Sequence, residues 1–293
     1  MLEHSNLRQQ HTIFGGVDVQ FANPPPEPFI KWVGGKRRQT RIIAQHSPNK
    51  INNYYEPFIG GGSVFYALHD KIYGKAYLSD INERLINAYQ CVRDNCDEVL
   101  LYLSNHADGY MEDEEIYYAM REVIDAGTPA MQAATFIFLN KTCFNGKYSV
   151  NKKNQFNCSK GHDAISHDYI CNVMQTKRAS EALQIAESIE CMSYSDLNCD
   201  IKAGDFMYLD PPYDETWDKY SSSPMKKDGQ IALHRFIKYY SNLGCNIMLS
   251  NNATDFIKDL YGEFNQMTIT ARQNLRTAGK QDMWAQEIII TNY

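Results

Sequence analysis

The sequence predicts an α/β fold, a Rossmann-like sheet with an inserted, mainly helical segment that carries a hairpin. A short strand beginning at Tyr54 runs into a glycine-rich turn and a helix that starts at Ser63, and a second strand follows at 76–79. The apolar run 206–209 stops at an acid and two prolines, as a strand does at its end. With 293 residues, 43% of them hydrophobic, the chain is long enough to bury a core.

Local patterns predict the remaining elements in order. Helices are expected at 83–93, 112–125, 129–140, 177–188, 230–242 and 254–260, and strands at 189–192, 246–250 and 287–292. A hairpin is expected at 144–156, with its turn at Asn145-Gly146. We therefore divide the chain into an N-terminal leader (1–27), a main α/β domain (28–95 plus 170–293) and an insert (96–169).

The run Asp210-Pro211-Pro212-Tyr213 is the strongest candidate for chemistry. Prolines fix φ and carry no N–H, so the backbone after the strand is stiff and offers carbonyl acceptors. A carboxylate, a carbonyl and a tyrosine ring suit a flat heterocycle with an exocyclic amine. An isolated Asp-Pro-Pro would more simply be a turn, but the apolar strand before it and the aromatic residue after it favour binding.

The glycine-rich turn predicts a nucleoside-bearing cofactor. Glycines 60–62 permit close backbone approach to a ligand, and Asp80 stands eighteen positions after Gly62, where nucleotide-binding units place a ribose-binding acid. The turn is neither G-x-G-x-x-G nor a Walker loop, and Glu56 just before it would repel a pyrophosphate. S-adenosylmethionine, which has no phosphate and carries a sulfonium cation, fits these residues.

Four motifs occur in a fixed order: FIKWVGGKR at 29–37, EPFIGGGSVF at 56–65, DIN at 80–82 and DPPY at 210–213. In this order they resemble the Dam-type DNA adenine-N6 methyltransferases, the D12 class in its alpha arrangement. NKTCFNG at 140–146, with Asn151 and FN at 156–157, is similar to the family's DNA-recognition hairpin. The resemblance extends from about residue 29 to residue 293. It implies S-adenosylmethionine as cofactor, double-stranded DNA as substrate, a methyltransferase sheet, and DNA recognition by the insert.

The resemblance also implies a role for each matching residue. Trp32 and Lys36 would contact the methionine part and carboxylate of the cofactor, and Asp80 its ribose hydroxyls. The remaining cofactor contacts would come from Glu56, Phe58, Gly60, Gly62 and Asp210, with Asp196 accepting from the adenine amine. The target base would be held by Asp210, Pro211, Pro212 and Tyr213. Contacts to DNA would come from Lys141, Asn145, Lys147, Tyr148, Ser149, Asn151, Lys152 and Lys153.

Several of these residues have a simpler structural alternative. Trp32 could be a core residue, and Lys36 belongs to a basic run at 36–41 that could be a solvated face. Asp80 also fits a helix N-cap, with Glu83 completing a capping box. Asp196 follows a serine after a strand, where turns commonly form.

The chemistry that these groups suit is methylation of an amine. The exocyclic nitrogen of adenine is a poor nucleophile, and hydrogen bonds to Asp210 and the Pro211 carbonyl would make it more electron-rich. Positive charge would then develop beside a fixed carboxylate. Because a base inside a duplex cannot reach such a pocket, the adenine must be flipped out and stacked on Tyr213.

The formal net charge of −6 conceals local basic tracks that suit a nucleic acid. Five lysines and no acid lie between 140 and 161, and further basic groups lie at 31–41 and 272–280, the last comprising Arg272, Arg276 and Lys280. The family members that recognise GATC carry an arginine three positions after the Asn-Gly pair, where this chain has Ser149. Arginine recognises guanine bidentately and serine does not. Our hypothesis is that the chain recognises a different or shorter motif, or methylates adenines loosely.

Other functions are also compatible with the sequence: methylation of cytosine N4, RNA adenine or a protein glutamine, or a non-catalytic DNA-binding relative. The intact DPPY run and the hairpin favour DNA adenine. The eight cysteines form no C-x-x-C pair, so we expect reduced thiols and no metal. With neither a secretory signal nor an apolar run of membrane length, we expect a cytoplasmic protein of a bacterial or phage-infected cell, without membrane contact and associated with the nucleoid, acting as a monomer or weak dimer on DNA.

Overall fold

The computed structural model describes residues 26–162, 164–213, 225–272 and 284–293. The expected leader, up to residue 25, lies outside this part of the chain, as do Arg276 and Lys280 of the third basic group. Among the described residues, no helix combines the length and the apolar character that a membrane crossing requires.

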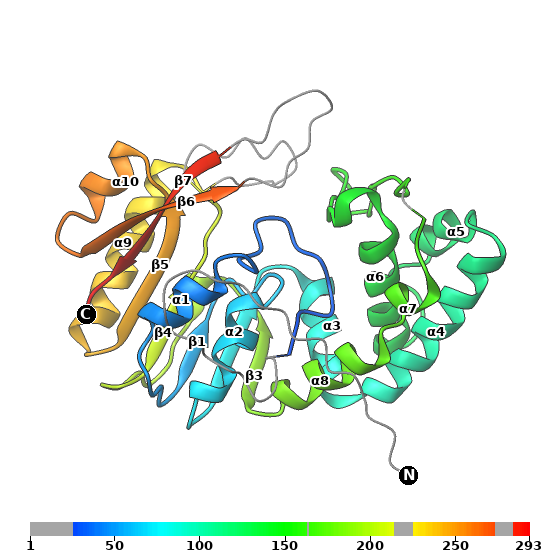
Figure 1. Ribbon diagram of the computed structural model, residues 1–293, viewed down its shortest axis with the longest axis horizontal. Helices are drawn as coiled ribbons and strands as arrows, with labels where there is room; N and C mark the ends of the chain where they lie inside the picture. The colour runs from blue at the N-terminus through cyan, green and yellow to red at the C-terminus, as the bar shows by residue number, and fades with distance from the viewer. Residues whose placement is uncertain (1–25, 163, 214–224, 273–283) are drawn as a thin grey trace, which may run out of the picture.

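A seven-stranded sheet forms the centre of the fold, in the order β3-β2-β1-β4-β5-β7-β6 (Figure 1). The first five strands in this order are parallel, and β7 runs antiparallel to both β5 and β6. The strands are β1 (Tyr54–Glu56), β2 (Ala76–Asp80), β3 (Ala186–Cys191), β4 (Phe206–Leu209), β5 (Asn246–Asn252), β6 (Asn265–Arg272) and β7 (Trp284–Thr291). The parallel strands end at one edge of the sheet, where ligands bind in α/β folds.

The helices follow the same chain order. They are α1 (Thr40–His46), α2 (Ser63–Leu68), α3 (Glu83–Asp94), α4 (Cys96–Glu112), α5 (Ile116–Glu122), α6 (Pro129–Thr142), α7 (His167–Ile170), α8 (Val173–Leu183), α9 (Lys227–Asn242) and α10 (Asp255–Leu260). Short 3₁₀ turns lie at η1 (His69–Lys71), η2 (Phe144–Gly146) and η3 (Tyr194–Asp196).

The central strands are buried on both faces of the sheet, and their side chains alternate between two hydrophobic cores. Along β4, Phe206 and Tyr208 belong to one hydrophobic core, together with side chains of α1, α2 and α3. Met207 and Leu209 point to the other face and belong to a second core, together with side chains of α9 and α10. The first core continues into helices α4, α6 and α8, which lie beyond α3 at one end of the sheet (Figure 1). The helices of residues 96–170 are thus packed onto the sheet domain through apolar side chains.

Several of the expected elements have different bounds in the structure. Helix α8 ends at Leu183, not 188, because Ala186 already pairs with Ala76 at the start of β3. The helix expected at 112–125 is present but shorter, as α5, which begins only at Ile116 and ends at Glu122. It is preceded by α4, which the patterns did not predict and which ends at Glu112. The acids at 112–115 lie at the C-terminal, negative end of the α4 dipole. Negatively charged side chains are unfavourable there, so this run of acids disfavours one continuous helix.

The hairpin is present only in part, and its turn is not at Asn145-Gly146. That pair forms the 3₁₀ turn η2 directly after α6, with Asn145 at φ 56°. The antiparallel bridge joins Val150 to Phe156, so the chain reverses at 151–155. The side chain of Asn151 organises this reversal by accepting from the backbone of Lys153 (2.8 Å) and of residue 155 (3.1 Å).

Candidate active site

A cavity of about 3170 Å³ lies at the carboxyl ends of β1, β2 and β4, and residues of the hairpin line it as well. It contains the glycine turn, the end of β2 and the DPPY run. The sequence motifs that are far apart in the chain therefore share one concave surface.

The glycine turn is shaped by what packs against it. Gly60 and Gly62 have φ of +46° and +69°, which side chains rarely adopt. A Cβ on Gly60 would lie 2.8 Å from Cδ1 of Trp32, and one on Gly62 would lie 2.6 Å from the hydroxyl of Tyr89. Glycine at both positions lets the turn fit between these two aromatic rings, so Trp32 is part of the cavity wall rather than of the core alone.

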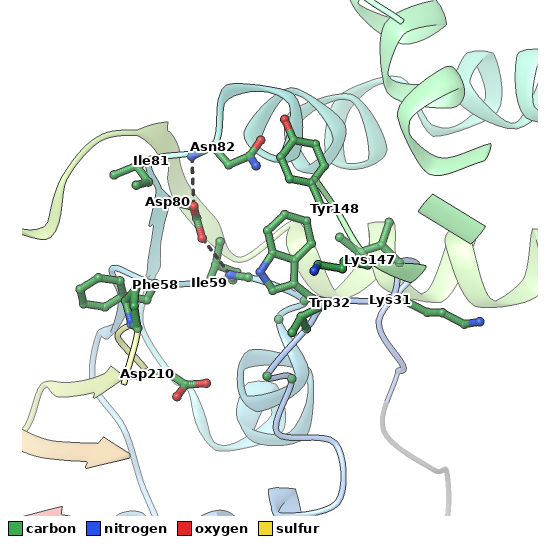
Figure 2. A pocket seen from close by; sticks show the side chains of 18 of the residues that line it. Lys31, Trp32, Phe58, Ile59, Asp80, Ile81, Asn82, Lys147, Tyr148 and Asp210 are labelled. Atoms are coloured by element: carbon green, nitrogen blue, oxygen red, sulfur yellow. Dashed lines mark hydrogen bonds between the residues drawn. The ribbon is translucent and has the colours of Figure 1, made fainter. Parts of the chain in front are cut away.

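Asp80 ties the end of β2 to the glycine turn (Figure 2). Its carboxylate accepts from the backbone N–H of Gly60 (3.1 Å) and of Asn82 (3.0 Å). Burial raises the pKa of Asp80, and these two backbone donors oppose that shift. The N-cap alternative for Asp80 is wrong, because the side chain of Asn82 accepts from Leu85 N and caps α3.

Three other residues that were expected to contact the cofactor lie in different environments from one another. Glu56 is buried and accepts from the hydroxyl of Tyr54 at 2.7 Å; burial raises its pKa. Phe58 lines the cavity and packs against Tyr194 at 5.3 Å between ring centroids. Asp196 is exposed in η3 and does not line the cavity, although Tyr194 does. The structure therefore does not bring Asp196 to the other site residues.

The end of β4 carries an ion pair. Lys36, 5% exposed, places its ammonium 2.8 Å from Oδ1 of Asp210 and 4.7 Å from the centroid of the Tyr213 ring, and it donates to the Gly34 carbonyl at 2.9 Å. Burial raises the pKa of Asp210, while Lys36 lowers it. Lys36 thus contacts the DPPY run, a position that the sequence did not predict.

Buried amides hold the carbonyl of Pro212 in the same run. Gln230 donates to the carbonyl of Pro212 at 3.1 Å and accepts from Asn251 at 3.0 Å, and both amide side chains are fully buried. Pro211, the preceding residue, is buried as well. This pair was missed from the sequence, because nothing local distinguishes a glutamine in α9 from a solvated one.

The hairpin meets Trp32, beside the glycine turn, through stacked rings (Figure 2). Tyr148 stacks on Trp32, with ring centroids 5.7 Å apart and planes 24° apart. Arg84, which follows β2, donates to the Tyr148 hydroxyl at 2.9 Å and to both carboxylate oxygens of Asp125 at 2.6 Å. Arg84 also donates to the Asn154 carbonyl at 2.9 Å, so one guanidinium joins α3 to the hairpin.

The expected DNA-contacting residues divide into two groups. Asn145, Lys147, Tyr148 and Ser149 line the cavity, whereas Asn151, Lys152 and Lys153 are exposed at the hairpin turn outside it. Ser149 is 7% exposed and donates to Asn157 Oδ1 at 2.7 Å.

Lys141 corrects the expectation of a phosphate contact. It is buried, donates to the Ile170 carbonyl at 3.1 Å, and burial lowers its pKa to about 8. An ammonium inside the helical segment cannot reach a DNA phosphate.

Two further cavity residues were not foreseen. Ile81 is 75% exposed although it lines the cavity next to Asp80, so an apolar surface stands beside the acid. Glu287, on β7, accepts from the Tyr213 hydroxyl at 2.9 Å. Ile81 directly follows Asp80 at the end of β2, and this adjacency is a local signal for a site residue. No local feature of the sequence around Glu287 indicates its contact with Tyr213.

A parallel sheet extended by an antiparallel β7, with an acid at the end of β2 and an amine-accepting run at the end of β4, is consistent with a methyltransferase. Residues 32–275 match the family described as D12 class N6 adenine-specific DNA methyltransferase. The chain belongs to this family.

Named relatives cover nearly the whole chain. It is similar to the type II methyltransferase M.MjaIII of Methanocaldococcus jannaschii, 33% identical over 91% of this chain and 99% of the relative. It is also similar to M1.LlaDCHI of Lactococcus lactis, 34% identical over 91% and 95%, and to the DNA adenine methylase of Haemophilus influenzae, 28% identical over 89% and 92%. The chain is thus an adenine-specific DNA methyltransferase by family.

Proposed function

We propose that this chain transfers the methyl group of S-adenosylmethionine to N6 of an adenine turned out of double-stranded DNA. The observation that carries the proposal is the environment of Asp210. The chain's own ammonium, on Lys36, donates to this carboxylate while lying over the ring of Tyr213. A cation with N–H donors thus occupies the position that the mechanism requires for an adenine amine.

The residues of the cavity fit the cofactor. Asp80 accepts two backbone hydrogen bonds, and an ionised carboxylate has about four acceptor sites, so it retains capacity for ribose hydroxyls. Ile81 and Phe58 offer apolar surface for a purine, and the acids in the wall suit a ligand that carries a cation. S-adenosylmethionine supplies a methyl group on a sulfonium ion, which is electrophilic.

The chain's own groups activate the amine. Once Lys36 leaves Asp210, the carboxylate and the Pro211 carbonyl accept the two N–H groups of adenine and favour a tetrahedral, electron-rich nitrogen. The positive charge that develops on N6 is stabilised by the ionised Asp210, and the proton is lost afterwards to Asp210 or to water. Tyr213 holds the base by stacking, at an orientation suited to in-line attack.

The insert of residues 96–169 supplies DNA recognition in this proposal. Lys152 and Lys153 are exposed at the hairpin turn, where phosphates can approach. Asn145 and Lys147 line the cavity and are candidates for base contacts, whereas the buried Ser149 hydroxyl is bonded to Asn157 and is poorly placed to recognise guanine. The enzyme therefore recognises a motif other than GATC, or methylates adenines loosely.

Substitution of Asp210 tests the reaction. Asp210→Ala and the isosteric Asp210→Asn should bind S-adenosylmethionine in calorimetry, while tritium transfer to duplex DNA falls by at least about 10²–10³-fold. Undiminished transfer by either variant would contradict the mechanism, and transfer to cytosine or RNA but not to adenine would contradict the substrate assignment.

Mapping N6-methyladenine in DNA treated with the protein tests sequence specificity. Methylation confined to GATC would contradict the proposal that the enzyme recognises a different motif or methylates adenines loosely.

A further inference from the structure

We infer that Glu287, on strand β7, is a positioning residue for methyl transfer that holds Tyr213 at the orientation in which it receives the target base. The inference rests on the proposed function. A single carboxylate oxygen of Glu287 accepts from the Tyr213 hydroxyl at 2.9 Å and from Nε2 of Gln39 at 3.0 Å. The Glu287 side chain thereby joins the catalytic run to the segment leading into α1.

The position of Glu287 is fixed from both sides of its strand. In the sheet, Glu287 pairs with Asn252 of β5 and with Ile269 of β6, so its backbone cannot shift without breaking two ladders. The residue is half-buried and lines the cavity. A rigid acceptor in the cavity wall is suited to holding an aromatic ring by its hydroxyl.

Tyr213 needs such an anchor because it stands at the end of the run and not within the strand. The prolines before it stiffen the backbone but do not fix the side-chain torsions of Tyr213. Its ring lies 4.7 Å from the Lys36 ammonium, which in turn contacts Asp210. Glu287 therefore acts on the reaction through Tyr213, without itself touching the amine.

The charges around Asp210 give this role a measurable signature. The groups that face Asp210 are Lys36 from the N-terminal segment, Glu56 from β1, Tyr208 and Tyr213 from β4 and its continuation, and Glu287 from β7. The negative charge of Glu287 raises the pKa of Asp210, and the hydrogen bond from Tyr213 lowers it. Neutralising Glu287 should therefore lower the pKa of Asp210, and removing the Tyr213 hydroxyl should raise it.

The experiment compares Glu287→Ala, Glu287→Gln and Tyr213→Phe in the full chain, with Glu187→Gln as control. Glu187 is an exposed acid on β3, paired with Lys75 outside the cavity. Glu287→Ala should lower kcat on the order of 10- to 100-fold while the Kd for S-adenosylmethionine changes less than about threefold. Glu287→Gln keeps the shape of the acceptor and should retain most of kcat.

The pH profile of kcat/KM separates positioning from a merely structural role. Its acid limb should move to lower pH in Glu287→Gln and to higher pH in Tyr213→Phe, and it should stay in place in the control. Unchanged kcat and an unchanged acid limb in the Glu287 variants, with wild-type activity on adenine and an inactive Asp210→Ala, would overturn this inference alone. Loss of adenine methylation in the wild type would overturn the proposed function as well. If Glu287→Ala does not fold, Glu287→Gln and Tyr213→Phe still decide through the opposite shifts.

Discussion

Replacing Gly60 with alanine should weaken cofactor binding as well as the fold. Gly60 has φ +46°, and a Cβ there would lie 2.8 Å from Cδ1 and 3.1 Å from Nε1 of Trp32. Alanine in a left-handed conformation costs about 1–2 kcal/mol. The contact is too short to persist, so the indole must move away from the turn and disturb its stack with Tyr148.

The expected magnitudes follow from these two effects. An aromatic pair contributes about 0.5–1.5 kcal/mol, so backbone strain plus a lost stack should destabilise the protein by roughly 2–3 kcal/mol. At about 2–4 °C per kcal/mol, the melting temperature should fall by roughly 4–12 °C. Loss of an indole contact of about 1.4 kcal/mol with the cofactor would raise its Kd about tenfold.

Gly244→Ala is the matched control. Gly244 also has a positive φ, +89°, but its Cβ would meet only the backbone and methyl group of Ala203, at 3.3 Å and beyond, outside the cavity. This variant should lose stability through strain and bind S-adenosylmethionine as the wild type does in titration calorimetry. If Gly60→Ala also binds with wild-type affinity while its melting temperature falls, Trp32 is not part of the cofactor site and the reasoning is refuted.

Three further predictions concern charges. Replacing Lys152 and Lys153 with alanine should reduce the slope of log K against log salt for DNA binding, measured by fluorescence anisotropy, by about 2. The control Lys141→Met should leave this slope unchanged. Equal slopes in the two variants would contradict a contact of the hairpin with DNA phosphates. Because burial raises the pKa of Asp210 and the amine needs an ionised acceptor, methyl transfer should decline with falling pH at a higher pH than for a free aspartate, and a rate that stays flat down to about pH 4 would disprove this. Arg84→Met should accelerate amide hydrogen exchange in the hairpin, and unchanged protection would show that the guanidinium does not hold it.

Features with a local cause were predictable from the sequence. Helix α2 begins at Ser63 because the glycine turn ends there, and α6 begins at Pro129, with Thr128 accepting from Met131 N as its cap. Strand β6 was missed because it is a largely polar edge strand, whose pairing with β7 supplies what its sequence lacks.

The site was predictable only as far as motifs carry it. Asp80 and Asp210 stand at the ends of strands, where the sequence motifs marked them as site residues, and both line the cavity. The partners of the reacting groups could not be found in this way. Glu287 meets Tyr213 across 74 positions of sequence, and Arg84 meets Tyr148 across 64, so each contact exists only after folding.

The cavity shared by the glycine turn and the DPPY run has a consequence for inhibition. At about 3170 Å³ it exceeds the roughly 300–1,000 Å³ typical of pockets for one small molecule, and both the glycine turn and the DPPY run line it. A compound that resembles only the nucleoside would leave most of this volume unfilled. A bisubstrate molecule that joins a nucleoside to a small cationic head able to displace Lys36 from Asp210 would bind both ends at once, and its second contact would benefit from the effective concentration set by a short linker.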